Sequence, residues 1–170
     1  MPFSLIPHAL FSRYEDLSVQ WLTQRGIKLL LSDLDFTLAP KSVRRPDQGL
    51  RDWIDQLKAA GIQCMIVSNN RSGKRVEEFC ADLGISYQGH AQKPSPKGLL
   101  AAMERSGIPK EQTAMLGDKL LTDVLAAHRA GVLALMVEPR GGAVTVWQKV
   151  LHALQAPFKA LCRENLKKPG

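Results

Sequence analysis

The chain has 170 residues, of which 45% are hydrophobic and 23% charged, and it carries a formal net charge of +7. This length suits one compact domain, predicted to span residues 1–170, and the composition excludes a disordered or collagen-like chain. The three cysteines are widely spaced and form no CxxC pair, so we expect reduced thiols rather than a zinc knuckle or a disulfide framework.

The hydropathy pattern excludes two kinds of hydrophobic segment. The N-terminal residues lack the basic start of a signal peptide. There is also no run of about 18 uncharged apolar residues, which a membrane-spanning helix would need. We therefore expect a cytoplasmic protein without a transmembrane segment.

Short apolar runs alternate with helical patterns through the middle of the chain. After an N-terminal segment with no assigned strand, strands are predicted at 27–32, 62–67, 85–87, 113–116 and 132–137, and helices at 47–60, 72–83, 95–106 and 121–130. A glycine follows each predicted helix, as is typical of helix ends. The alternation implies right-handed crossovers and a parallel sheet covered on both faces, which is a Rossmann-like three-layer α/β/α fold.

Polar residues stand where the predicted strands end. In parallel sheets of this kind, ligands bind at the carboxyl ends of the strands. We expect one crevice to contain Asp33, Asp35, Ser68, Asn69, Asp118 and Asp123.

The acidic residues among them predict a metal site. Asp33 and Asp35 are separated by one residue, and such close carboxylates raise one another's pKa unless a cation lies between them. Asp118 and Asp123 supply a second acidic pair, and an all-oxygen set of ligands favours Mg²⁺. Hydroxyl groups at Thr37 and Ser68 and the ammonium of Lys93 are suited to binding a phosphoryl group.

Four short motifs connect these residues to a known family. DLDFTL, VSNN, the Lys93-Pro94 pair and GDKLLTD resemble, in order and approximate spacing, the four motifs of the haloacid dehalogenase (HAD) superfamily. The resemblance spans residues 27–137. It is closer to the small YqeG-type phosphatases of subfamily IIIA, through GIKLLLSDLDFTLAP, IVSNN and LGDKLLTDVLAAHRAG. Proteins that resemble this pattern include phosphatidylglycerophosphate phosphatases.

The resemblance implies a role for each matching residue. Asp33 is expected to be the nucleophile of a magnesium-dependent phosphatase, Asp35 its general acid and base, and Lys93 the cation beside the transferred phosphoryl group. The implied substrate-binding residues are Thr37, Ser68 and Asn69. The implied Mg²⁺ ligands are Asp33, the backbone carbonyl of Asp35, Asp118 and, through water or by orienting the other ligands, Asp123.

Some of these roles have alternatives. Lys97 lies close enough to Lys93 in sequence to compete for its role, and Asn69 also fits a simple turn. Phe36 departs from the resemblance, because close relatives commonly have Asn or another small or polar residue there. We expect activity to survive, since that position contributes mainly its backbone.

The ends of the chain suggest where the substrate lies. The segments between the motifs are too short for a cap domain, so the cleft of this capless HAD core is open and suits large or surface-bound phosphate esters. Residues 143–170 form a basic, amphipathic extension with a helical apolar pattern at 145–162. Together with Phe3, Leu5, Ile6, Leu10 and Phe11, this extension is predicted to rest on an anionic membrane, at its inner face. Phosphatidylglycerophosphate is the substrate that this arrangement favours.

Two alternatives remain open at this point. One is a soluble phosphatase for nucleotide or sugar phosphates. The other is a non-catalytic protein that binds nucleic acid through its basic tail, although nucleic acid is not the partner we favour. The tail also fits an ordinary solvated helical face.

Overall fold

A computed structural model describes residues 5–70, 73–139, 157 and 164–165. Its centre is a seven-stranded sheet with the order β4-β3-β2-β5-β6-β1-β7, in which all neighbouring strands are parallel. The strands are β1 Ala9–Phe11, β2 Leu29–Ser32, β3 Gln63–Val67, β4 Ser86–Gln88, β5 Thr113–Gly117, β6 Leu133–Val137 and β7 Glu164–Asn165. The α-helices are α1 Val19–Gln24, α2 Gln48–Ala59, α3 Lys74–Leu83, α4 Lys97–Ser106 and α5 Leu125–Ala130.

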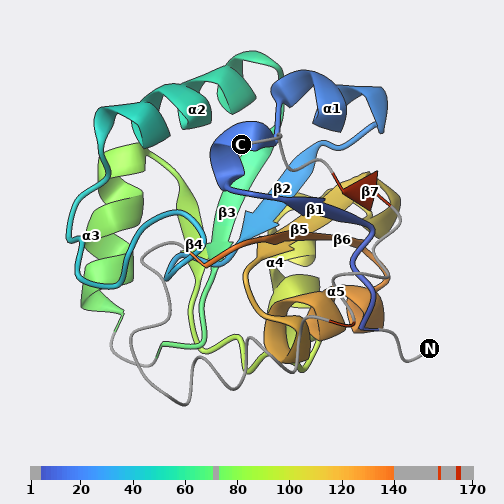
Figure 1. Cartoon of the computed structure of the whole chain (residues 1–170). Helices are drawn as coiled ribbons and strands as arrows, with labels where there is room; N and C mark the ends of the chain where they lie inside the picture. Colours follow the sequence, from blue (N-terminus) through green and yellow to red (C-terminus); the bar gives the residue numbers. More distant parts are fainter. Residues whose placement is uncertain (1–4, 71–72, 140–156, 158–163, 166–170) are drawn as a thin grey trace.

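Helices cover both faces of the sheet. Figure 1 shows α1 and α2 on one side and α4 and α5 on the other. The two faces carry separate apolar clusters: Leu30 and Ile66 face Ile54 of α2 and Phe79 of α3 in one of them. In the other, alternate strand residues such as Met65 and Met115 face Leu99 of α4. This arrangement is the predicted three-layer α/β/α fold.

The sheet register brings the functional loops together. Ser32, the last residue of β2, is opposite Ile66 of β3 and Leu116 of β5, so the three central strands end at nearly the same level. The backbone amide of Asp33 continues the pairing by donating to the carbonyl of Leu116 at 3.0 Å. Residues that follow these strands must therefore converge at one edge of the sheet.

The structure confirms the predicted strands and differs at three places. The first is the N-terminal segment, where β1 pairs with β6 and buries Leu10 and Phe11 (1% and 0% exposed). The prediction that these two side chains rest on a membrane is therefore wrong, because the sheet already buries them.

The other differences concern α5 and β7. The predicted helix 121–130 begins instead with a π-helical turn, Leu120–Val124 (η3), and continues as α5. The strand β7 was not predicted; it extends the sheet beyond β1. The amphipathic segment 145–162 lies outside the described residues except for Pro157.

Two further expectations concern cysteines and membrane spans. Cys64 and Cys80 are free and buried, and burial raises the pKa of both thiols to about 12. Within the part of the chain that the structure describes, no helix combines the length and apolar character needed to cross a bilayer.

Candidate active site

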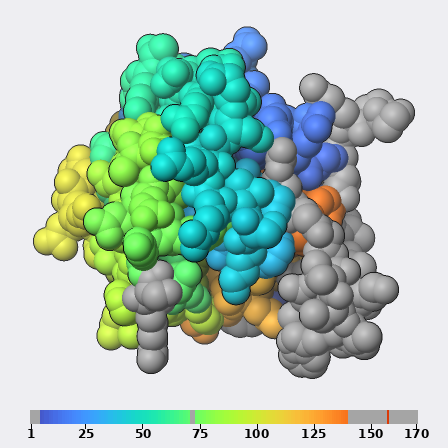
Figure 2. All heavy atoms as spheres, turned by 90° about the vertical axis from the view of Figure 1, so that its left-hand side faces the viewer, coloured from blue at the N-terminus to red at the C-terminus, as the bar shows by residue number. Residues whose placement is uncertain are grey.

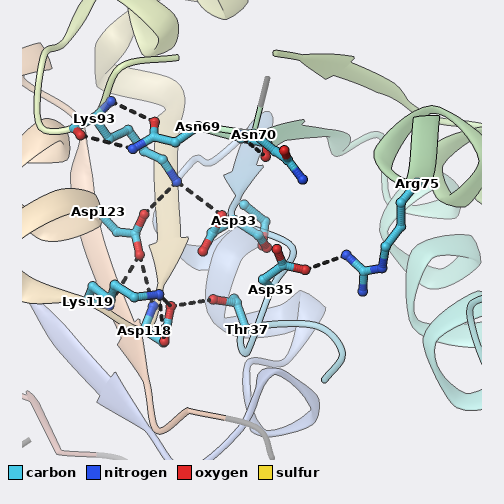
Figure 3. Close-up of polar contacts among 12 residues, drawn as sticks. Asp33, Asp35, Thr37, Asn69, Asn70, Arg75, Lys93, Asp118, Lys119 and Asp123 are labelled. Atoms are coloured by element: carbon cyan, nitrogen blue, oxygen red, sulfur yellow. Dashed lines mark hydrogen bonds and ion pairs between the residues drawn. The ribbon is translucent and has the colours of Figure 1, made fainter. Parts of the chain in front are cut away.

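Lys93 connects two acidic residues from distant parts of the chain, Asp33 after β2 and Asp123 in η3. Its ammonium nitrogen lies 2.7 Å from Asp123 Oδ1 and 3.2 Å from Asp33 Oδ1 (Figure 3). Asp33 directly follows β2, and Lys93 lies in the loop between β4 and α4. Burial alone would lower the pKa of Lys93, but Asp123 and Asp33 outweigh it and raise that pKa. Lys93 is therefore a fixed positive charge beside Asp33, whereas Lys97 is exposed.

Asp123 uses both carboxylate oxygens within the protein. Oδ1 binds Lys93, and Oδ2 accepts hydrogen bonds from the backbone amides of Asp118 and Lys119, both at 3.2 Å. Gly117 makes this approach possible, because a Cβ atom at that position would overlap the side chain of Asp123. Asp123 thus holds both the turn after β5 and Lys93 in place.

Asp118 faces the same group of carboxylates. Its Oδ1 accepts a hydrogen bond from Thr37 Oγ1 at 3.3 Å, and the ammonium of Lys119 lies 3.4 Å from both of its oxygens. Thr37 and Asp118 are almost fully buried. The Lys119 ammonium also lies 5.4 Å from the centre of the Phe36 ring.

Negative charge exceeds positive charge at the centre of this cluster. Oxygens of Asp33, Asp118 and Asp123 lie within 4.8 Å of one another. Burial raises the pKa of Asp33 to about 6, although Lys93 opposes the shift. Burial, and secondly Asp123, raise the pKa of Asp118 to about 7. Because a divalent cation would relieve this repulsion and carboxylate oxygens are suitable ligands, the cluster fits a metal such as Mg²⁺.

Asp35 lies apart from this cluster. Its carboxylate pairs with the guanidinium of Arg75, on the side away from Lys93 and Asp123 (Figure 3). The structure thus brings Asp33, Lys93, Asp118 and Asp123 together through their side chains, and Asp35 joins them only through its position two residues after Asp33. Its predicted roles as general acid and as a backbone ligand stay predictions.

The predicted phosphate-binding residues are all at this edge of the sheet, and all three make hydrogen bonds within the protein: Thr37 with Asp118, as described above, and Asn69 and Ser68 as follows. Asn69 Oδ1 accepts from the backbone amide of Lys93 at 2.8 Å, and its Nδ2 donates to the carbonyl of Lys93 at 3.0 Å. Asn69 is therefore a support for Lys93 rather than a simple turn former. Ser68 Oγ accepts from the backbone amide of Asn70 at 3.1 Å.

Sequence reasoning missed two cations of the site, Arg75 and Lys119. Lys119 lies inside a motif that was recognised, so its position beside Asp118 was a usable signal. No comparable signal marks Arg75, since the sequence does not distinguish it from Lys74. Only the packing of α3 makes Lys74 exposed and Arg75 half-buried.

A buried lysine and three carboxylates at the carboxyl edge of a parallel α/β sheet are suited to binding a metal ion and transferring a phosphoryl group. A profile of the haloacid dehalogenase-like hydrolases matches residues 9–131. The chain belongs to this family, and it is a phosphatase of the HAD superfamily. This membership favours an enzyme over the non-catalytic alternative.

Curated relatives support the same assignment. The chain is 33% identical over 134 residues to the probable phosphatase YqeG of Bacillus subtilis, covering 79% of this chain and 77% of that protein. It is 28% identical over 142 residues to the chloroplastic phosphatidylglycerophosphate phosphatase 1 of Chlamydomonas reinhardtii, covering 79% of this chain but 53% of the relative. The chain thus spans about half the length of that relative.

Solved structures share the fold. The 3-deoxy-D-manno-octulosonate 8-phosphate phosphatase of Moraxella catarrhalis, crystallised with magnesium, phosphate and KDO, is similar with a TM-score of 0.52 and 21% identity, over 84% of this chain and 94% of that one. The cobalt-bound phosphatase YrbI of Haemophilus influenzae gives a TM-score of 0.54 and 23% identity, over 78% and 90%. At this level of identity the similarity concerns the fold alone.

Proposed function

We propose that the chain is a magnesium-dependent phosphomonoester hydrolase that acts through an aspartyl-phosphate on Asp33. The observation that carries the proposal is the position of the Asp33 carboxylate, 3.2 Å from the Lys93 ammonium and grouped with Asp118 and Asp123. A carboxylate nucleophile is repelled by a phosphate dianion unless positive charge lies nearby. The Lys93 ammonium supplies that charge beside Asp33.

The reaction has two steps. A carboxylate oxygen of Asp33 forms a bond to phosphorus while the bond from phosphorus to the leaving oxygen breaks, and Asp35 gives that oxygen a proton. A water molecule then attacks phosphorus, gives its proton to Asp35, and releases inorganic phosphate from Asp33. Lys93 neutralises charge on the phosphoryl oxygens in both steps. Asp33, Asp118 and the backbone carbonyl of Asp35 would hold Mg²⁺, which supplies further positive charge when bound.

The test is phosphate release from p-nitrophenyl phosphate with Mg²⁺ or with EDTA. We expect activity only with Mg²⁺, and we expect Asp33→Asn to abolish it. Asp82→Asn is the matched control, because Asp82 lies at the far end of α3 and pairs with Arg51 and Arg45. Full activity in Asp33→Asn, or in EDTA, would reject the mechanism.

Phosphatidylglycerophosphate is the substrate that we favour. Two relatives carry the name phosphatidylglycerophosphate phosphatase, at 28% and 25% identity. Residues 33–62, between β2 and β3, contain α2 and the loops on either side of it and no inserted cap, so we expect the cleft to be open. An open cleft admits a phosphate group that remains attached to a lipid in a membrane. The location that follows is cytoplasmic, with peripheral contact to the inner face of the membrane.

A soluble sugar phosphate is the second candidate. The chain is 31% identical over 132 residues to the 3-deoxy-D-manno-octulosonate 8-phosphate phosphatase KdsC of Salmonella typhi, covering 66% of this chain and 65% of that protein. Parallel assays with phosphatidylglycerophosphate in vesicles and with 3-deoxy-D-manno-octulosonate 8-phosphate separate the two. A higher kcat/KM for the lipid, together with flotation of the protein on anionic vesicles, supports the first candidate. Preference for the sugar phosphate without flotation supports the second.

A further inference from the structure

Among the residues that the structure describes, the side chain of Arg75 makes three polar contacts, and each of these reaches the loop that follows β2. One guanidinium nitrogen, Nη1, pairs with Asp35 Oδ1. Nε donates to the carbonyl of Val43 at 2.9 Å, and Nη2 donates to the carbonyl of Pro40 at 3.1 Å. The aromatic ring of Phe79, one turn further along α3, lies beneath the guanidinium with its centre 5.8 Å away. Each guanidinium nitrogen thus has a defined acceptor.

The loop and α3 form one continuous surface. Figure 2 shows residues 36–46 lying against α3 on the face that it presents. The paired side chains are largely covered, with 17% of Arg75 and 23% of Asp35 exposed. Arginine suits such a place, because its planar fork offers several donors in a rigid arrangement that lysine cannot reproduce. The guanidinium of Arg75 therefore fixes the position of the Asp35 carboxylate relative to the loop.

The direction of the Asp35 side chain makes this contact relevant to catalysis. In Figure 3 the carboxylate of Asp35 points toward Arg75, while Asp33 points toward Lys93. A carboxyl group that delivers a proton to a leaving oxygen must be held in one orientation, since small displacements are costly for proton transfer. Within the described part of the chain, Arg75 is the residue that pairs with this carboxylate.

We propose that Arg75 is a positioning residue for Asp35, holding its carboxylate at the leaving-group side of the cleft and tying it to the loop at Pro40 and Val43. This inference rests on the proposed function, in which Asp35 is the general acid. Arg75 acts through Asp35 and does not touch the phosphoryl group. Its loss should therefore affect the substrates that need a proton on the leaving oxygen.

The dependence on leaving group is the main test. An alkyl phosphate releases a strongly basic oxygen and needs the general acid, whereas 2,4-dinitrophenyl phosphate releases a weakly basic one and does not. Because kcat/KM reports the first step alone, we expect Arg75→Met to lower kcat/KM for an alkyl phosphate by about 10-fold to 100-fold, and for the dinitrophenyl ester by less than about 3-fold. The kcat for the dinitrophenyl ester should also fall, since Asp35 accepts the proton of water in the second step. KM for the alkyl ester should change little. Arg75→Lys should recover only part of the loss, because it keeps the charge without the fork.

Arg51 supplies a matched control. It joins α2 to the end of α3 by the same kinds of contact, from Nη1 to the carbonyl of Asp82 at 2.9 Å and from Nη2 to Asp82 Oδ2 at 3.9 Å. Arg51→Met should lower kcat/KM equally, and only slightly, for both esters. Should Arg75→Met fail to fold, Arg75→Lys carries the same comparison.

A double-mutant cycle with Asp35→Asn separates failure of the inference from failure of the proposed function. If Arg75 acts through Asp35, Arg75→Met has no further effect on kcat for the alkyl ester once Asp35 is Asn. Additive losses, or equal losses of kcat/KM for both esters in Arg75→Met, would overturn the inference and leave the role of Asp35 intact. An Asp35→Asn variant that treats both esters as the wild type does would overturn the role of Asp35, and the inference with it.

Discussion

Lys93 Nζ lies 2.7 Å from Asp123 Oδ1, and the two side chains are only 3% and 1% exposed. Removing one member of such a buried pair leaves the other charge without compensation. We expect Lys93→Met to lower the free energy of unfolding by about 3–5 kcal/mol. It should also lower kcat by at least about 100-fold, since the charge beside the phosphoryl group is lost. Urea unfolding and phosphate release measure the two effects.

Two further variants make this prediction specific. Lys97→Met, at an exposed lysine four residues further along, should change neither quantity. Lys93→Met combined with Asp123→Asn should recover much of the stability, because the uncompensated carboxylate is gone, but none of the activity. Unchanged stability in Lys93→Met alone would contradict the buried-pair interpretation.

Asn69 is expected to act on catalysis through the backbone of Lys93. Asn69→Ala removes both hydrogen bonds to that backbone and should lower kcat by about 10-fold, with a small effect on KM. Asn69→Asp keeps the acceptor for the Lys93 amide and loses the donor to its carbonyl, so its kcat should fall between those of wild type and Asn69→Ala. A rise in KM at constant kcat would instead support the original prediction that Asn69 binds substrate.

The raised pKa values of Asp33 and Asp118 predict how stability depends on pH. Both carboxyls have an ordinary pKa of 3.8, but burial raises the values to about 6 and about 7 in the folded protein. At pH values between 3.8 and these raised pKa values, the folded state binds more protons than the unfolded state. Without metal, the stabilisation that comes from protonating these two carboxyls is therefore complete below their ordinary pKa. It is lost as the pH rises through about 6 to 7.

Mg²⁺ should reverse part of this loss. Protons and the cation compete for the same carboxylates, so the increase in Tm caused by Mg²⁺ should be larger at about pH 8 than at about pH 5. Thermal melts with EDTA and with Mg²⁺ at both pH values measure it. Asp118→Asn should raise the metal-free Tm at about pH 8, because it removes a buried charge, and should remove most of the Mg²⁺ effect. An equal Mg²⁺ effect at both pH values would argue against binding by this cluster.

Phe36 has a backbone conformation that disfavours its own side chain. Its φ angle is +64°, in the left-handed region, where Asn is tolerated better than a bulky residue. Phe36→Asn should relieve about 1–2 kcal/mol of strain and lose about 0.5–1 kcal/mol from the contact with Lys119. The net result is a small rise in Tm with activity retained. Phe36→Ala is the control, since it loses the ring and keeps a Cβ at the same φ; an equal rise in that variant would assign the effect to the ring.

Local patterns in the sequence determined the alternation of strands and helices, and with it the fold class. Apolar runs such as 27–32 and the glycines after each helix are local signals, so they can be recognised without knowledge of the fold. Because parallel strands end at one edge of the sheet, these patterns also predicted that Asp33, Asp118 and Asp123 belong to one site, to which the motif resemblance added Lys93. The four motifs assigned their expected chemistry through resemblance.

Tertiary structure alone decided how these residues are paired. The contact of Lys93 with Asp123, the support of Lys93 by Asn69, and the pairing of Asp35 with Arg75 join residues that are 30, 24 and 40 positions apart in sequence. The same holds for β1, whose three residues become a strand only because β6 lies beside them. A short segment has too few local interactions to specify its own conformation, so burial and hydrogen bonding against distant parts of the chain determine it.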